Sequence, residues 1–274
     1  MFSEIAVIIN FNWNHSFCLM PEFQITREVF LLLFATGLAA GFVDAIAGGG
    51  GLIALPVLLS VGLPPQVALG TNKLQGSFGT FSAAYNFIRK GHVNFREGIT
   101  GILTTFVGAV LGSWTVQWLE PVFLGRIIPV LLFLVLVYTY FSKNLGLEDH
   151  DPKMSRRAFF LLFGLGLGFY DGFFGPGTGS FWMAGFCIFL GFNMTKSAGY
   201  TRLMNFTSNI VALSIFIIGG NVLYSVGLCM AGGQLIGARI GSNLAIQNGA
   251  RFIRPIFMVV VCVTIARLVY LNYR

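Results

Sequence analysis

Apolar residues follow one another in long runs along most of the chain, with few polar side chains inside them. We distinguish five apolar segments in each half, in chain order 28–47, 52–63, 66–88, 98–119 and 122–142, then 156–174, 179–191, 196–218, 221–246 and 250–272. Most are close to the roughly 20 residues that a helix needs to cross a bilayer. The second segment of each half is shorter and suits a half-helix or a re-entrant piece. The pattern predicts an all-α polytopic transmembrane bundle with about 8 to 10 membrane segments.

Glycine-rich breaks interrupt this pattern at two related places. One stretch reads GFVDAIAGGGG over residues 41–51, and another reads GFYDGFFGPGTG over residues 168–179. Asp44 and Asp171 occupy the same place in the two stretches, 127 residues apart. Hydrocarbon offers no partners to free backbone groups, so irregular backbone at membrane depth must line a buried site or cavity. The two stretches therefore predict a duplicated site within two transmembrane repeats, residues 28–142 and 156–274.

Basic residues predict how the repeats are oriented. The loop after segment 66–88 holds Arg89, Lys90 and Arg96. The polar connection 143–155 and the two residues after it hold Lys143, Lys153, Arg156 and Arg157, so both loops belong in the cytoplasm. The corresponding loop of the second half, residues 219–221, carries no basic residue and belongs outside. The same position thus faces opposite sides, which predicts an inverted repeat. Residues 1–27 lack this organisation; we interpret them as an N-terminal extension, with Met20 as an alternative start of translation.

Composition excludes several classes of protein. The chain is 55% hydrophobic and 10% charged, with a mean hydropathy of +0.79, whereas soluble domains carry about 25% charged residues. The lipid bilayer is therefore an expected partner. The net charge of +7 forms no continuous basic face, so a nucleic acid is not expected as a partner. We find no phosphate-binding loop, catalytic constellation or metal-ligand spacing, and expect neither an enzyme nor a metal site nor a cofactor.

Two cations inside apolar segments are the strongest candidates for function. Lys73 falls opposite Arg202 when the halves are aligned with a two-residue insertion, and Asn72 falls opposite Thr201. A charge there costs about 2.5–3.5 kcal/mol, so it should be paired or functional. Glycine-rich breaks that lead into helices also present backbone N–H groups to anions. The further members of the predicted anion-binding cradle are Gly49, Gly50, Thr71, Ser77, Gly177, Thr178 and Ser208. Together they predict a small oxyanion as substrate.

The two acids leave three interpretations open. Asp44 and Asp171 pair with the two cations, cap a half-helix through its free N–H groups, or carry a coupled proton. Capping is the simplest interpretation beside a glycine break. If the acids pair with the cations, Lys73 and Arg202 serve only to neutralise them. The structural and functional roles coexist if these ion pairs exchange with substrate.

Small residues at helical spacing predict close packing between helices. Gly108 and Gly112 in the first half correspond to the series Gly233, Gly237 and Gly241 in the second. Such spacing lets backbones approach closely in a membrane. We interpret these glycines as packing residues rather than ligand-binding ones.

At these motifs the sequence resembles the TauE/SafE family of sulfite-exporter-type transporters. The matching stretches are GFVDAIAGGGG at 41–51, GTNKLQ at 70–75, GFYDGFFGP at 168–176, LMNFTSN at 203–209 and GQLIGARIG at 233–241. The resemblance covers residues 28–272 and is closest to a bacterial inner-membrane branch. Arg202 stands where a lysine is common in the family.

The resemblance implies a multi-pass protein of the plasma membrane and a sulfur-containing anion as substrate. We therefore expect a secondary transporter that exports sulfite, an organosulfonate or a related sulfur oxyanion by alternating access. An anion channel and a non-transporting membrane scaffold are the alternatives.

Overall fold

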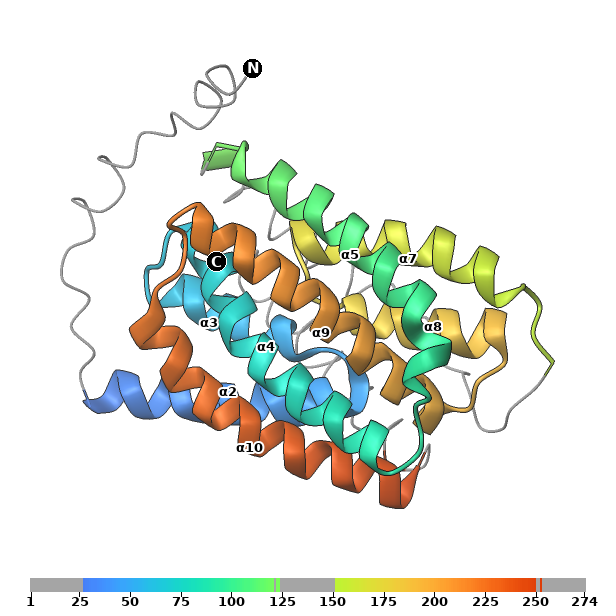
Figure 1. Ribbon diagram of the computed structural model, residues 1–274. Helices are drawn as coiled ribbons and strands as arrows, with labels where there is room; N and C mark the ends of the chain where they lie inside the picture. Colours follow the sequence, from blue (N-terminus) through green and yellow to red (C-terminus); the bar gives the residue numbers. More distant parts are fainter. Residues whose placement is uncertain (1–26, 121, 124–150, 250–251, 253–274) are drawn as a thin grey trace, which may run out of the picture.

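The computed structural model of the protein describes residues 27–120, 122–123, 151–249 and 252. Every long element in these ranges is an α-helix (Figure 1). The helices are α2 (Arg27–Ala47), α3 (Gly50–Ser60), α4 (Pro65–Arg89), α5 (Phe95–Gln117), α7 (Arg156–Phe173), α8 (Thr178–Leu190), α9 (Met194–Ile218) and α10 (Tyr224–Asn248). The all-α prediction is thus confirmed for this part of the chain. The predicted segments 122–142 and 250–272, the extension 1–27 and most of the connection 143–155 lie outside the described residues.

The helices begin and end within a few residues of the predicted segments, and the differences have a local cause. Helix α5 starts at Phe95 rather than at residue 98, because the side chain of Asn94 accepts a hydrogen bond from the Arg96 N–H and caps the helix. Asn193 caps α9 in the same way through the Lys196 N–H. The first turns of α5 and α9 contain polar residues. The predicted apolar segments therefore begin a few residues after the helices do.

The helices differ in their ability to cross a bilayer. Among the described residues, α2, α5 and α9 are long and apolar enough to do so. Helices α3 and α8 have 11 and 13 residues. At 1.5 Å per residue they extend only about 16 Å and 20 Å, short of a hydrocarbon core of about 30 Å. A helical membrane bundle is therefore supported, and its two short helices are half-helices by length.

The two halves are intertwined rather than side by side. Helices α4 and α9 pack together in the centre, with α2 against α10 on one side and α5 against α7 on the other (Figure 1). Each outer pair thus joins the first helix of one half to the last described helix of the other. In Figure 1, α2 and α4 run toward one end of the molecule, whereas α7 and α9 run toward the opposite end.

Glycines form the contact surfaces of both outer pairs. A Cβ added to Gly112 of α5 would lie 2.0 Å from the Phe169 carbonyl oxygen of α7. One added to Gly237 of α10 would lie 2.0 Å from the Leu38 carbonyl oxygen of α2. No real Cβ fits at such distances, so these backbones are in direct contact. The interpretation of the glycine series as packing residues is confirmed.

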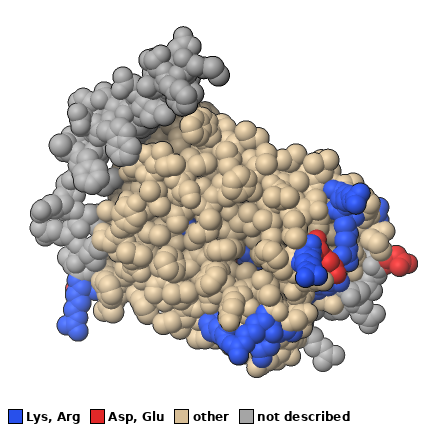
Figure 2. All heavy atoms as spheres, in the orientation of Figure 1, with Lys and Arg blue, Asp and Glu red and all other residues tan. Residues whose placement is uncertain are grey.

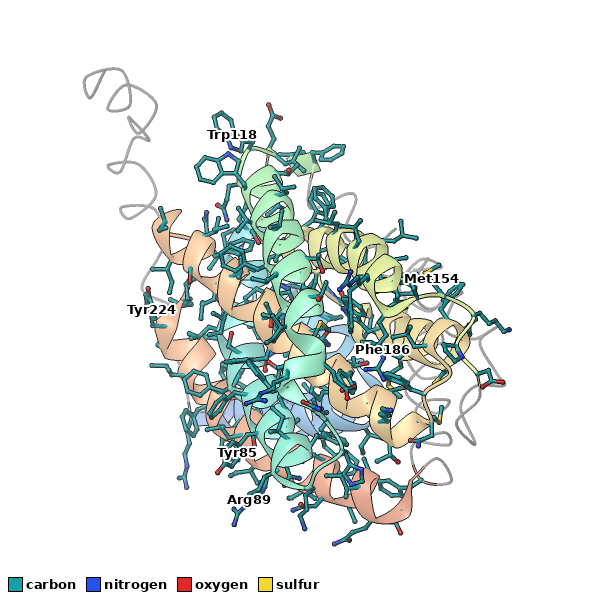
Figure 3. The ribbon with its side chains drawn as sticks, turned by 45° about the vertical axis from the view of Figure 1, so that its right-hand side comes forward. Tyr85, Arg89, Trp118, Met154, Phe186 and Tyr224 are labelled. Carbon is teal, nitrogen blue, oxygen red and sulfur yellow. The ribbon has the colours of Figure 1, made fainter. Side chains whose placement is uncertain are left out.

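The short helices lie inside the bundle, each in its own hydrophobic cluster. Leu52, Leu55 and Leu58 of α3 belong to one cluster, and Trp182 and Phe186 of α8 belong to the other. Figure 3 shows Phe186 pointing into the bundle. Outward-facing Leu, Phe and Ile side chains of α2, α5, α7 and α10 are exposed instead. Figure 2 shows one face of the molecule as a broad surface nearly free of charge, with Lys and Arg gathered near its lower and right margins. Such a surface suits contact with lipid.

Candidate functional site

Each glycine stretch ends one helix and starts another. Helix α2 ends at Ala47 and α3 begins at Gly50, and Gly48 between them has a φ of 82°. Helix α7 ends at Phe173 and α8 begins at Thr178, with Gly175 at a φ of 96°. Side chains are strongly disfavoured at such positive φ angles, so glycine is required where the chain reverses its helical path. The predicted helix breaks are therefore present in both halves.

The two breaks are in direct contact with each other. A Cβ added to Gly48 would lie 2.5 Å from the carbonyl carbon of Gly179, and one added to Gly179 would lie 2.5 Å from Cα of Gly48. The Ser180 hydroxyl also donates to the Ala47 carbonyl oxygen at 3.2 Å. The starts of α3 and α8, with the partial positive charge of helix N-termini, therefore meet at one place in the bundle.

Lys73 of α4 is bound to the end of α7. Its Nζ lies 2.7 Å from Oδ1 of Asp171, 2.5 Å from the Asp171 carbonyl oxygen and 3.3 Å from Oδ1 of Asn209. The other carboxylate oxygen of Asp171 accepts a hydrogen bond from the Ser208 hydroxyl. The Lys73 side chain is 2% exposed. The ammonium therefore has an oxygen partner for each of its three protons.

Arg202 of α9 forms the equivalent pair with Asp44 of α2, but more loosely. The closest approach, from Nη1 to Oδ2, is 3.4 Å, longer than the roughly 2.7–2.9 Å of a charge-assisted hydrogen bond. Nε and Nη1 of this fully buried arginine lack a hydrogen-bond partner. Oδ1 of Asp44 accepts from the Gly50 N–H at 3.3 Å, at the start of α3. Asp44 thus has both a capping contact and an ionic contact.

Both cations are paired with an acid from the opposite half of the chain. Lys73 belongs to the first half and contacts Asp171 of the second, while Arg202 belongs to the second and contacts Asp44 of the first. Burial in a bundle makes an unpaired charge costly, so these pairs join the halves at the site. The structure therefore has the charge pairing that the sequence left as one alternative.

A small cavity lies where the breaks and the charge pairs meet. Its volume is about 30 Å³, room for about two water molecules. Its lining comes from six helices and both breaks: Asp44, Gly48, Gly51, Asn72, Lys73, Gln75, Gly76, Asp171, Gly175, Gly177, Asn205, Asn209 and Gln234. Carboxamide side chains of α4, α9 and α10 supply much of its polar surface. The site offers polar binding groups and charges to a small solute.

Only some of the residues predicted for the cradle reach this cavity. Lys73, Asn72, Gly177 and the two acids line it, whereas the remaining predicted residues do not: Gly49, Gly50, Thr71, Ser77, Thr178, Thr201, Arg202 and Ser208. Several of these have structural partners.

The hydroxyl of Thr71 accepts from the Leu223 N–H at 3.0 Å, and that of Thr178 donates to the Gly175 carbonyl oxygen at 2.6 Å. Ser77 donates to the Lys73 carbonyl oxygen of its own helix. The Thr201 hydroxyl is buried without a hydrogen-bond partner. Ser77 and Thr178 therefore bond to residues that line the cavity, whereas Thr71 and Thr201 do not.

Sequence reasoning missed the carboxamides Gln75, Asn205, Asn209 and Gln234. A signal existed in α9, because Asn205 and Asn209 are four residues apart and so lie on one helix face. The same holds for Asn72 and Gln75 of α4, which are three apart and hydrogen-bonded at 2.8 Å. Gln234 has no such neighbour and is identified by its place in the fold.

The described part of the chain lacks a cluster of histidine, cysteine and carboxylate side chains. No group of three or more His, Cys, Asp or Glu side chains there could hold a metal ion. The cavity lining holds paired carboxylates, one ammonium and amides, without a histidine or a cysteine. This arrangement can bind and release a polar solute.

Comparison with known proteins agrees with this geometry. The family model described as sulfite exporter TauE/SafE matches residues 33–268. A probable membrane transporter protein of Haemophilus influenzae is 41% identical over 89% of this chain and 95% of its own length. The probable membrane transporter protein YfcA of Escherichia coli is 41% identical over 90% and 92% of the two lengths, and the Sinorhizobium protein ORF9 is 43% identical over 83% and 87%. No solved structure matches the chain.

The relatives are named as probable membrane transporters, and the family match spans both glycine breaks and both charge pairs. The exposed apolar helices fit the same location. The chain therefore belongs to the TauE/SafE family of membrane transporters, as a multi-pass protein of the bacterial inner membrane.

Proposed function

We propose that the protein is a secondary transporter of a small anion, and that the anion binds in the cavity between the two helix breaks. The observation that carries this proposal is the position of Lys73. Its ammonium lies in a cavity into which the N-terminal ends of α3 and α8 also open. Helix N-termini attract small oxyanions through their free N–H groups, and a lysine ammonium adds a compact positive charge.

Binding would proceed by exchange of partners. In the described conformation Lys73 is neutralised by Asp171, so a free anion gains access to the ammonium only if that carboxylate gives way. Ser208 remains bonded to the second oxygen of Asp171 and would hold the carboxylate as the ammonium turns. The lysine is a flexible point charge, which suits such a movement better than the planar guanidinium of Arg202.

An inverted repeat that alternates access fits the way in which the halves are combined. Equivalent helices run in opposite directions in Figure 1, and each charge pair contains one residue from each half. Rocking of one half against the other would strain both pairs and both glycine contacts together. Transporters of this type place their binding site near the midplane, at discontinuous helices.

The proposed substrate is sulfite or a related small sulfur oxyanion, exported from the cell. The sulfur chemistry and the direction rest on the family name alone. The cavity favours an inorganic ion over an organosulfonate, since its volume of about 30 Å³ is small beside the several hundred Å³ of sites for larger organic ligands.

Flux of radiolabelled sulfite in proteoliposomes tests the proposal. The wild-type protein is expected to take up label against internal unlabelled sulfite (counterflow), which a channel does not do. Lys73→Gln should abolish the flux, whereas Lys196→Gln should not, because Lys196 lies over the Phe192 ring, outside the cavity.

Wild-type flux by a folded Lys73→Gln protein would refute the site. Flux without counterflow would favour a channel, and no flux of any anion would favour a scaffold.

A further inference from the structure

Three buried carbonyl oxygens of residues around the cavity have no hydrogen-bond partner among the described residues. They are Oε1 of Gln75, Oδ1 of Asn205 and Oε1 of Gln234, all from residues that line the cavity. The three residues are only 1%, 6% and 1% exposed. Buried acceptors are nearly always satisfied in folded proteins, and three unsatisfied ones around one cavity indicate a missing ligand.

Two of the unsatisfied groups, those of Gln234 and Asn205, lie near the end of α2. Oε1 of Gln234 is 2.6 Å from the position that a Cβ on Gly41 would take, one turn before Asp44. The amide of Asn205 lies against Gly179, which itself contacts Gly48. The C-terminal end of a helix carries partial negative charge, and the carboxylate of Asp44 adds to it. This side of the cavity is therefore rich in oxygen acceptors.

The corresponding end of α7 shows what such a place attracts. There the ammonium of Lys73 contacts both the carboxylate and the carbonyl oxygen of Asp171. At the end of α2 the equivalent cation, Arg202, stays 3.4 Å from Asp44 and has none of the carboxamide oxygens as a hydrogen-bond partner. The end of α7 thus has a bonded lysine beside it, whereas the carboxamide oxygens around the cavity lack partners.

We propose that the cavity binds a sodium ion at the end of α2, ligated by the Asp44 carboxylate and by the amide oxygens of Gln75, Asn205 and Gln234. Hard cations take carboxylate and Asn or Gln carbonyl oxygens as ligands. In discontinuous transporter helices, C-terminal half-helix ends provide such ligands for Na⁺. The Asp44 carboxylate adds a full negative charge to the amide oxygens, and a strong ligand field favours the smaller Na⁺ over K⁺.

The sodium ion changes the electrostatics of the neighbouring anion position. Two acids and two cations leave the described site formally neutral, so a bound Na⁺ makes it positive by one charge. If the proposed anion transport is right, Na⁺ and anion each raise the affinity of the other, because coupling between two ligands is reciprocal. This second step rests on the proposed function, whereas Na⁺ binding itself does not.

Thermal unfolding of the full-length protein in detergent tests Na⁺ binding without any anion substrate. Choline chloride is replaced by NaCl or KCl at constant chloride and ionic strength. A ligand that binds only the folded state raises its Tm. We expect a saturable rise of about 4 °C or more with NaCl and a smaller one with KCl. Equal shifts in NaCl, KCl and choline chloride would overturn the proposal.

Two variants at Gln234 identify the ligand atoms. Gln234→Leu removes the carbonyl oxygen and should reduce the apparent Na⁺ affinity at least tenfold, whereas Gln66→Leu, a buried glutamine that bonds Leu119 outside the cavity, should not. Gln234→Glu supplies a carboxylate and should retain or increase the rise in Tm caused by Na⁺.

The amides could instead turn their NH₂ groups toward an anion. In that case Na⁺ does not change the Tm of Gln234→Glu, and the variant is no longer stabilised by sulfite. Stabilisation by sulfite but not by Na⁺ would reject the sodium site and retain the anion site.

Discussion

The ammonium of Lys73 contacts both the side chain and the backbone of Asp171, at 2.7 Å and 2.5 Å, and so ties α4 to the last turn of α7. The two residues are 98 positions apart and come from different halves. Their counterparts, Arg202 and Asp44, also approach each other across the halves but remain 3.4 Å apart. The site is therefore asymmetric, although the sequence motifs that form it are repeated.

Removing one member of the tight pair should destabilise the protein strongly. Lys73→Met leaves the Asp171 carboxylate buried without its cation, and breaking a buried pair in this way costs about 3–5 kcal/mol. Adding Asp171→Asn should restore part of the loss, because the amide needs no counter-charge. A double-mutant cycle based on denaturant unfolding measures the coupling between the two residues. Strictly additive effects of the two substitutions would contradict the observed pairing.

The loose pair should show weaker coupling in the same cycle. Arg202→Met and Asp44→Asn remove a contact of 3.4 Å, and Asp44 also accepts from the Gly50 N–H. Asparagine retains an acceptor for that N–H, so Asp44→Asn should preserve the start of α3. We expect a coupling energy below that of Lys73 and Asp171, at the lower end of the roughly 0.5–3 kcal/mol seen for contacting residues. Coupling as large as that of the Lys73 pair would show that Arg202 is held more tightly than its distance implies.

The glycine contact between α5 and α7 predicts a clear contrast between two Gly→Ala substitutions. At Gly112 an added Cβ would lie 2.0 Å from the Phe169 carbonyl oxygen, so Gly112→Ala forces the helices apart and should cost about 1–3 kcal/mol. At Gly166 an added Cβ meets nothing within 4 Å. Gly166→Ala should therefore be neutral or stabilise α7 by up to about 1 kcal/mol through helix propensity. Thermal unfolding of both variants checks the contrast, and similar Tm values would argue against the close contact.

The helices could be predicted because their determinants are local. Runs of apolar residues gave α2 and α9 to within a few residues, and the positive φ of Gly48 and Gly175 explains why the breaks are rich in glycine. The repeated motifs also left pairing of Asp44 and Asp171 with the cations as one of three interpretations, with capping as the simplest.

The composition of the cavity could not be predicted in the same way. Gln234 reaches the site only because α10 packs against α2, and nothing in the sequence near Gln234 states that pairing. Thr71 and Thr178 have the right chemistry for ligand binding, yet their hydroxyls are bonded to backbone elsewhere. Which of many polar side chains face the cavity is decided by helix rotation and partner choice, and both depend on residues far away in the chain.

The orientation of the repeats predicts opposite accessibility for two loops. Lys90 follows α4 and Asn221 follows α9, and these helices end at opposite ends of the molecule in Figure 1. Figure 3 shows the same separation, with Arg89 at one end and Tyr224 toward the other. Arg89 and Lys90 make the first loop basic, which places it in the cytoplasm.

Single cysteines at these two positions test the prediction in intact cells. Lys90→Cys and Asn221→Cys are introduced into a protein whose native cysteines are replaced by serine or alanine, and a membrane-impermeant maleimide is added before or after permeabilisation. We expect label at residue 221 in intact cells and at residue 90 only after permeabilisation. Labelling of both residues from one side would exclude the inverted repeat, because helices that run in opposite directions cannot end on the same face of the membrane.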